Sequence, residues 1–386
     1  MIPRGKLYIS YSDLFTGLYY CLKSGKAKAV QPKDNNLVCL SVRTGFDLVL
    51  SALNFAPGSE MLVIDINIPD MFRIVAAHDI KAVGLTVDKH SLNISAAQIE
   101  AAVTPNTRAI LITHLFGSIM ETDEIIAIAK KHKLMIFEDC AQAYAGDVYE
   151  GNPVSDIVMF SFGFIKTNTA VSGAVIKINK EELYAKATAL NKQYIRQNTS
   201  RYFKKLLKVS FVKLLNSKAI YTLFYKLVMV LGKNFEQVLS GFTKGFPGDD
   251  ICRQIRYRPC IANELLLQRK LKKFRQKSIK ERIELANDVL HSIPEKYRIG
   301  SQNARHTYWV LPVETNDPDG LINYLRSNGF DASQKASSLV HLESVGYTMG
   351  ASDLNLDKLV YLPAYTAMSK SERKQLGKLI SSFLGD

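Results

Sequence analysis

Short apolar runs alternate with amphipathic stretches over residues 41–180 of the chain. Stretches with apolar residues at helical spacing predict helices at 48–53, 95–103 and 122–132, and a further helix beginning at 74. The apolar runs predict strands at 61–66, 82–87, 109–113, 134–137, 157–160 and 174–178, the last at an exposed edge. This rhythm is typical of an α/β fold, with a mostly parallel sheet, right-handed crossovers and helices on both faces.

The pattern changes from residue 263 onward. A long, very basic helix is expected at 264–290, followed by a strand at 307–313 and helices at 320–327 and 371–384. We therefore divide the 386 residues into a large domain, 1–250, and a smaller C-terminal α+β domain, 251–386.

Composition is that of a globular protein, with 47% hydrophobic and 22% charged residues. The five cysteines are odd in number and lack C-x-x-C spacing, which indicates reduced thiols and argues against a disulfide framework or zinc site. The first residues lack the apolar core of a signal peptide, so we expect a cytoplasmic protein.

The net charge of +14 is concentrated in one segment. Eleven Lys and Arg residues, and no acid, lie between 183 and 235. Residues 202–215 are cationic and amphipathic, whereas 219–231 are apolar but shorter than the ~20 residues needed to cross a bilayer. The segment 201–245 therefore has two interpretations: it lies on an anionic membrane surface, or it forms a helical hairpin packed on the protein. No binding motif accompanies the charge, which argues against a nucleic-acid partner.

Two polar residues follow apolar strands in the candidate sheet. Asp139 ends the strand that includes 134–137, and Lys166 comes five residues after Ser161, at the end of the strand 157–160. Ligands of open α/β sheets bind at the carboxyl ends of strands, so both side chains should reach one crevice. An amine and an acid placed there suit pyridoxal 5'-phosphate, which forms a Schiff base with a lysine and needs a protonated ring nitrogen.

The motifs around these residues resemble a known family. Residues 138–142, E-D-C-A-Q, and 161–166, S-F-G-F-I-K, are similar to the E-D-x-A-Q and S-F-x-x-x-K motifs of the DegT/DnrJ/EryC1/StrS sugar aminotransferases. Further likenesses follow in order: H-L-F-G at 114–117, R-Y-R-P at 256–259 and L-P-A-Y at 362–365.

The resemblance implies a pyridoxal-phosphate enzyme of fold type I, working as a homodimer with shared active sites. Lys166 would carry the cofactor, Asp139 would hold the ring nitrogen and Gln142 would lie near the phenolic oxygen. The residues expected to bind the phosphate are Ser161, Thr44, Gly45 and, from the neighbouring subunit, Arg256, with Arg43 as an additional cation. Unpaired histidines such as His114 are interpreted as structural, with no metal site.

Some residues depart from the family pattern. Residues 67–71 replace its aromatic-rich segment, and 169–173 replace a glycine-rich stretch and lose its acid. The resemblance implies transfer of an amino group from an amino acid, glutamate by family habit, to a keto or aldehyde group of a nucleotide-linked sugar. The departures keep two alternatives open: a lipid or lipid-linked carbonyl acceptor at a membrane surface, and a non-catalytic relative that binds the cofactor.

Overall fold

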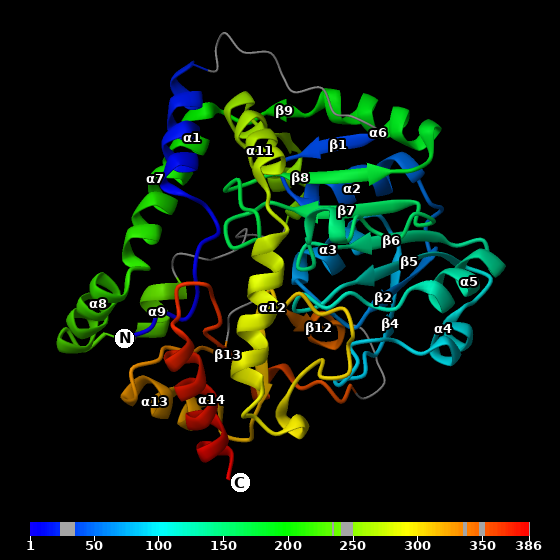
Figure 1. The fold of residues 1–386 in the computed structure, drawn as a ribbon. Coiled ribbons are helices and arrows are strands. Elements are labelled where there is room, and N and C mark those ends of the chain that lie inside the picture. The colour runs from blue at the N-terminus through cyan, green and yellow to red at the C-terminus, as the bar shows by residue number, and fades with distance from the viewer. Residues whose placement is uncertain (24–34, 234, 241–249, 335–337, 347–351, 386) are drawn as a thin grey trace.

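A seven-stranded sheet forms the centre of the molecule (Figure 1). The computed structural model describes residues 1–23, 35–233, 235–240, 250–334, 338–346 and 352–385. The strands lie in the order β1 (Asn36–Cys39), β8 (Ala174–Ile178), β7 (Ile157–Ser161), β6 (Met135–Asp139), β5 (Thr107–Thr113), β2 (Glu60–Ile64) and β4 (Lys81–Leu85). β7, β6, β5, β2 and β4 are parallel, whereas β8 is antiparallel to both its neighbours. The predicted α/β class, with its mostly parallel sheet, is confirmed.

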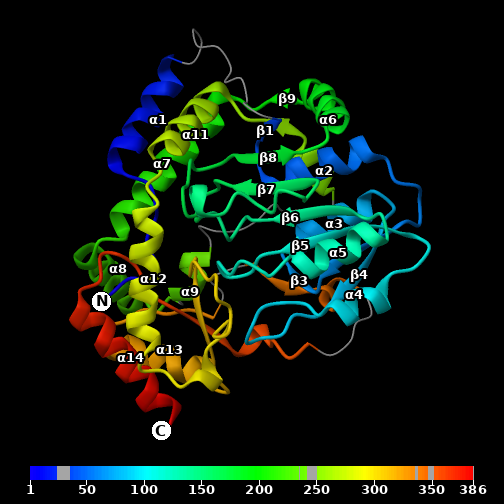
Figure 2. The same cartoon turned by 45° about the vertical axis from the view of Figure 1, so that its right-hand side comes forward.

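Helices cover both faces of the sheet (Figure 2). One face packs on α2 (Val42–Leu53), α3 (Pro69–Ala77), α6 (Glu181–Gln193) and α10 (Ile251–Ile255). The other packs on α4 (Ala96–Ala102) and α5 (Asp123–Lys131), and further along on α1 (Tyr11–Lys23), α7 (Thr199–Leu215) and α11 (Ile261–Lys273). Side chains alternate between the two faces along each strand. In β7, Met159 therefore packs in the core beneath α2, and Phe160 packs in the core on the opposite face, with α1, α7 and α11.

The C-terminal part has a core of its own. It combines α12 (Lys277–Leu290), α13 (Pro318–Ser327) and α14 (Lys370–Leu384) with the antiparallel pair β11 (Leu311–Glu314) and β13 (Leu359–Leu362). Short pairs join β3 (Ile66–Asn67) to β12 (Val340–His341) and β9 (Ile195–Arg196) to β10 (Tyr257–Arg258). Helical 3-10 turns occur at Gly146–Val148, Glu295–Tyr297, Leu342–Val345 and Leu356–Lys358. The division at residue 250 stays a prediction.

Several expected elements differ from those observed. Strand 174–178 lies between β1 and β7, and not at an edge, because β1 pairs along its other side. The helix expected at 264–290 is two helices, because Phe274 is extended and its ring packs on Tyr144, with centroids 5.0 Å apart. The helix expected to begin at 74 begins at Pro69, where proline suits the first turn, and ends at Ala77. The strand expected at 307–313 begins only at Leu311.

We call residues 201–245 the basic segment. Its described residues lie mostly in three helices: α7, α8 (Lys218–Val230) and α9 (Phe235–Ser240). α7 buries Tyr202, Leu206 and Val209 against neighbouring helices, and the Tyr202 hydroxyl donates to the Ala170 carbonyl at 2.8 Å. Residues 241–245, at the end of the basic segment, lie outside the described part of the chain. Within that part, no helix combines the length and apolar character needed to span a membrane.

Candidate active site

Lys166 lies in the turn that follows β7. Its backbone N–H donates to the Gly163 carbonyl at 3.1 Å, which closes the turn. Its Nζ stands 4.3 Å from the ring centroid of Trp309, whose indole N–H donates to the Ile165 carbonyl at 3.1 Å. Burial, together with repulsion from Arg43, lowers the pKa of Lys166 to about 8. The negative charge of Asp139 acts in the opposite direction and raises this pKa, but its effect is smaller. The Nζ makes no hydrogen bond with the described residues, so the amine is available to a ligand.

Asp139 ends β6 and is buried. One carboxylate oxygen accepts the Ala141 backbone N–H at 2.9 Å, and the other makes no hydrogen bond within the described part of the chain. Burial raises the pKa of Asp139, and the nearby Lys166 acts against that rise. The acid and the amine, 27 residues apart in sequence, therefore interact electrostatically at the carboxyl edge of the sheet.

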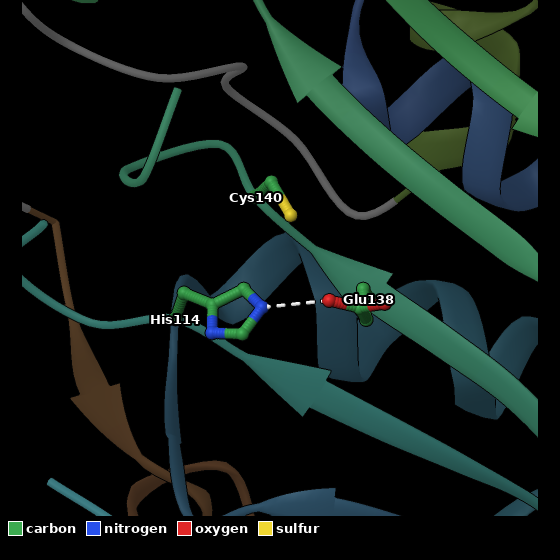
Figure 3. A group of neighbouring side chains, drawn as sticks. All are labelled: His114, Glu138 and Cys140. Atoms are coloured by element: carbon green, nitrogen blue, oxygen red, sulfur yellow. Dashed lines mark hydrogen bonds and ion pairs between the residues drawn. The ribbon is translucent and has the colours of Figure 1, made fainter. Parts of the chain in front are cut away.

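A buried hydrogen-bond network fixes the strand just before Asp139 (Figure 3). Glu138 accepts from His114 Nε2 at 3.0 Å and from the Asn152 backbone N–H at 2.7 Å, and also from the hydroxyls of Tyr149 and Ser155. Although burial acts to raise it, these hydrogen bonds hold the pKa of Glu138 below its ordinary value. The network anchors a charged side chain that points to the opposite face from Asp139.

The same network bears on metal binding. His114, Glu138 and Cys140 lie close enough together to share an ion. However, His114 Nδ1 accepts the Met120 backbone N–H at 3.0 Å, which leaves Nε2 to carry the proton donated to Glu138. Burial raises the pKa of the Cys140 thiol well above its ordinary value. The atoms that could bind a metal are thus protonated or already hydrogen-bonded, and the arrangement favours a structural role for these three residues.

Ser161 ends β7, and Gln142 follows the end of the neighbouring strand β6. Ser161 Oγ accepts only a long hydrogen bond, 3.5 Å, from the Gly163 N–H, so its hydroxyl is available to a ligand. The Gln142 side-chain oxygen accepts the backbone N–H of Phe116 at 2.8 Å, which holds a residue with a positive φ of 57°. Gln142 therefore supports the turn after β5, while the roles expected for both residues toward a cofactor stay predictions.

The expected phosphate residues on α2 are engaged within the chain. The Thr44 hydroxyl donates to the Ile255 carbonyl at 2.8 Å, and the Gly45 N–H donates to the Ser41 carbonyl at 3.1 Å. A Cβ at Gly45 would come within 2.3 Å of Ile176, so this glycine lets the helix pack on β8. The amide of Val42, the first residue of α2, precedes any acceptor within the helix and is the better-placed donor.

Arg256 is bound to an acid of its own chain. Its guanidinium donates to both oxygens of Asp47, each at 2.9 Å, and Asp47 also accepts from His78 and Tyr194. Despite burial, these donors hold the pKa of Asp47 well below its ordinary value. The Arg256 side chain remains 43% exposed, so a role toward a neighbouring subunit stays a prediction.

Sequence reasoning missed Trp309, and it gave Arg43 only a secondary place. Trp309 is the only tryptophan of the chain and contacts the Lys166 amine from the C-terminal part. It comes close because Gly117, with a φ of 98°, leaves room: a Cβ there would lie 2.3 Å from the Trp309 backbone nitrogen. Arg43 pairs with Asp70 and lowers the pKa of Lys166. Its being the single tryptophan of the chain was the available sequence signal.

The described residues fit a pyridoxal-phosphate group. An amine without a hydrogen bond, a buried carboxylate with one unused oxygen, and a weakly engaged serine hydroxyl occur at neighbouring strand ends. The mostly parallel α/β sheet, with this set of residues at its carboxyl edge, fits the fold type I class of pyridoxal-phosphate enzymes.

Comparisons with known proteins agree. The family model of the DegT/DnrJ/EryC1/StrS aminotransferase family matches residues 29–221, half of the chain. The chain belongs to this family. Its fold resembles a family aminotransferase from Brucella abortus, with a TM-score of 0.69, 16% identity and coverage of 97% of this chain and 96% of that one. It also resembles the sugar aminotransferase CalS13 from Micromonospora echinospora, with a TM-score of 0.68, 17% identity and coverage of 99% and 100%.

A curated relative is more similar in sequence but over a shorter stretch. GDP-perosamine synthase from Caulobacter vibrioides is 33% identical over 175 residues, which cover 43% of this chain. The match spans about half of that relative, 46% of its length.

Proposed function

We propose that this protein is a pyridoxal-phosphate-dependent aminotransferase. The observation that carries the proposal is the pair Lys166 and Asp139, an amine with a lowered pKa that interacts with a buried acid at one sheet edge. When bound, the cofactor supplies an electron sink for the carbon from which a proton is removed. The family membership supports the same reaction class.

Each residue of the site has a proposed task. Lys166 would hold the cofactor through its Nζ, and the same atom would accept and return the proton moved during the reaction. Asp139 keeps the ring nitrogen protonated, because its second carboxylate oxygen can accept a hydrogen bond from that N–H group. Ser161 holds the phosphate together with the N-terminal end of α2, where Thr44 and Gly45 lie. Gln142 holds the turn at Phe116 that borders the ring.

The proposed donor is an amino acid, glutamate first, and the proposed acceptor is a keto or aldehyde group of a nucleotide-linked sugar. The similarity to GDP-perosamine synthase and to a sugar aminotransferase supports this acceptor. A test adds glutamate to the cofactor-loaded protein and follows the cofactor's visible absorbance. Wild type should lose the band on adding glutamate and recover it on adding a keto acceptor. Lys166→Ala should show neither change; an unresponsive wild-type band with every amino acid would favour the non-catalytic alternative.

A second candidate acceptor is a lipid or lipid-linked carbonyl compound. Three neighbouring helices, α1, α7 and α8, carry stripes of exposed apolar residues. These residues are Tyr11, Phe15, Tyr19, Leu22, Leu207, Phe211, Leu214, Leu223, Leu227 and Val230. Together with exposed basic residues of α7 and α8, such as Arg201, Lys204 and Lys226, they form a surface suited to an anionic membrane.

Vesicle sedimentation tests this surface. Each cation near an anionic leaflet contributes on the order of 1 kcal/mol, so reversing exposed Lys204 and Lys226 to Glu should release most of the protein. The matched control reverses Lys130, in the last turn of α5, and Lys133, just after it; both are exposed and lie away from these helices. If both double variants sediment like wild type, or if wild type does not sediment at all, the helices serve packing alone.

We also propose a homodimer with shared active sites, in which Arg256 reaches the cofactor phosphate of the partner. The exposed half of its side chain supports this arrangement. Mixing Lys166→Ala with Arg256→Ala subunits should restore activity, because one site of each mixed dimer then carries neither change. Absence of restored activity in mixed dimers would confine Arg256 to its bond with Asp47.

A further inference from the structure

A cavity of about 620 Å³ lies between the basic segment, the N-terminal strand-like residues 4–8 and the C-terminal part. It borders the turn that carries Lys166: Ile165, immediately before the lysine, lines the cavity, and so does Trp309, whose ring lies beside the lysine amine. Pockets of a few hundred to about 1,000 Å³ suit small-molecule ligands. The cavity is thus placed to hold part of a molecule that reacts at Lys166.

The wall of the cavity is mostly apolar, and the basic segment supplies part of it. Val212 and Leu215 come from α7 and Phe224 from α8; Leu7 and Phe164 add to the same lining. The helices that carry the exposed apolar stripes therefore also present apolar side chains inward. Residues of the basic segment, and not only those of the family motifs, shape this space.

Two arginines at the cavity are already paired with acids. Arg4 donates to Asp331 at 2.6 Å and to Glu236 at 2.7 Å; Arg326 donates to Asp331 at 2.8 Å and also binds Glu236. Two guanidinium groups thus face two carboxylates, and the Tyr221 hydroxyl also donates to Asp331. Because each arginine is already paired with two acids, neither is available to bind the diphosphate of a nucleotide.

One polar atom in the wall is unused. The Tyr365 hydroxyl is buried, lines the cavity and makes no hydrogen bond with any described residue. A buried hydroxyl without a partner is costly. The apolar side chains that α7 and α8 contribute to the lining favour a ligand with an aliphatic part on that side of the cavity.

We propose that this cavity binds an aliphatic chain of the acceptor, so that the chain lies against α7 and α8 while the carbonyl group meets Lys166. The proposal rests on the proposed aminotransferase function and favours its lipid-type acceptor.

The test titrates the full-length, cofactor-loaded protein with 1-hexanol, 1-octanol and 1-decanol. Binding is measured by isothermal titration calorimetry and by the fluorescence of Trp309, which lines the cavity and is the only tryptophan of the chain. Each added methylene should lower Kd roughly four-fold until the cavity is filled. Leu215→Phe, which narrows the cavity, should raise Kd at least ten-fold for 1-decanol. Leu214→Phe, the same change at the exposed neighbouring position, should leave Kd unchanged.

The outcomes separate this proposal from the reaction. A protein that responds to glutamate but binds no alkanol, or binds all three equally, overturns the apolar subsite and leaves the aminotransferase function intact. Binding that Leu215→Phe does not weaken places the alkanol elsewhere and also overturns it. Chain-length-dependent binding without any response to glutamate would instead retain the cavity and refute the reaction.

Discussion

The lowered pKa of Lys166 predicts how the protein captures its cofactor. Only the neutral amine attacks an aldehyde. With a pKa of about 8, roughly one lysine in ten is neutral at pH 7, against about one in three thousand at the ordinary value of 10.5. The environment thus increases the reactive form about 300-fold at neutral pH.

The assay measures the rate at which cofactor-free protein takes up pyridoxal phosphate, by stopped-flow absorbance between pH 6 and 11. A small amine of known pKa serves as the reference for the cofactor's own ionisation. The rate should rise about ten-fold per pH unit up to about pH 8 and then level off. A single rise that continues to about pH 10.5 would refute the reasoning, because it would show an amine with an ordinary pKa.

A pair of variants tests the cause of this shift. Arg43 and Arg73 both lie near Asp70, but only Arg43 contributes to the shift at Lys166. Arg43→Gln removes a neighbouring positive charge, so the midpoint of the rate profile should move upward. Arg73→Gln is the matched control and should leave it in place. Equal midpoints in the two variants would show that burial alone lowers the pKa.

Three further predictions concern the residues that support the site. Asp139→Asn should still take up the cofactor but slow amino transfer on the order of a hundred-fold or more, measured as single turnovers with glutamate; an unchanged rate would refute its role at the ring nitrogen. Glu138→Gln should lower the free energy of unfolding in urea by about 3 kcal/mol, since the amide NH2 replaces one carboxylate oxygen and leaves either His114 and Tyr149 or Asn152 and Ser155 without their acceptor. Because the pKa of Glu138 is lowered on folding, its contribution in wild type is complete above about pH 4.5 and is lost below it. Gly117→Ala should cost at least about 2 kcal/mol, from its left-handed backbone and the contact with the Trp309 backbone, and should also change Trp309 fluorescence.

The sequence could place Asp139 and Lys166 together because both depend on local order: each follows an apolar strand, and parallel strands end at one edge. Trp309 could not be placed in this way. It reaches the lysine from 143 residues away, through the packing of the C-terminal part and the space left by Gly117. The partners of the Thr44 hydroxyl and of Arg256 likewise depend on the position of α10 against α2, which no local pattern encodes.

The same distinction applies to the basic segment. Its helices follow from charge and apolar spacing, and they are observed as α7 and α8. Which side of each helix would be buried was not evident, because apolar residues occur on more than one face. Tyr202 and Leu206 pack inward, Val212 lines a cavity and Phe211 is exposed, an arrangement set by the neighbouring α1 and α11.

The central claim, that Lys166 carries the cofactor, is tested most directly by chemical trapping. Borohydride reduction of the pyridoxal-phosphate-loaded protein would make the lysine bond permanent, and peptide mass spectrometry would then locate it. The account predicts one modified lysine, Lys166, and no modification of Lys166→Ala under the same conditions. A phosphopyridoxyl group on any other lysine, or none on the wild-type protein, would contradict it.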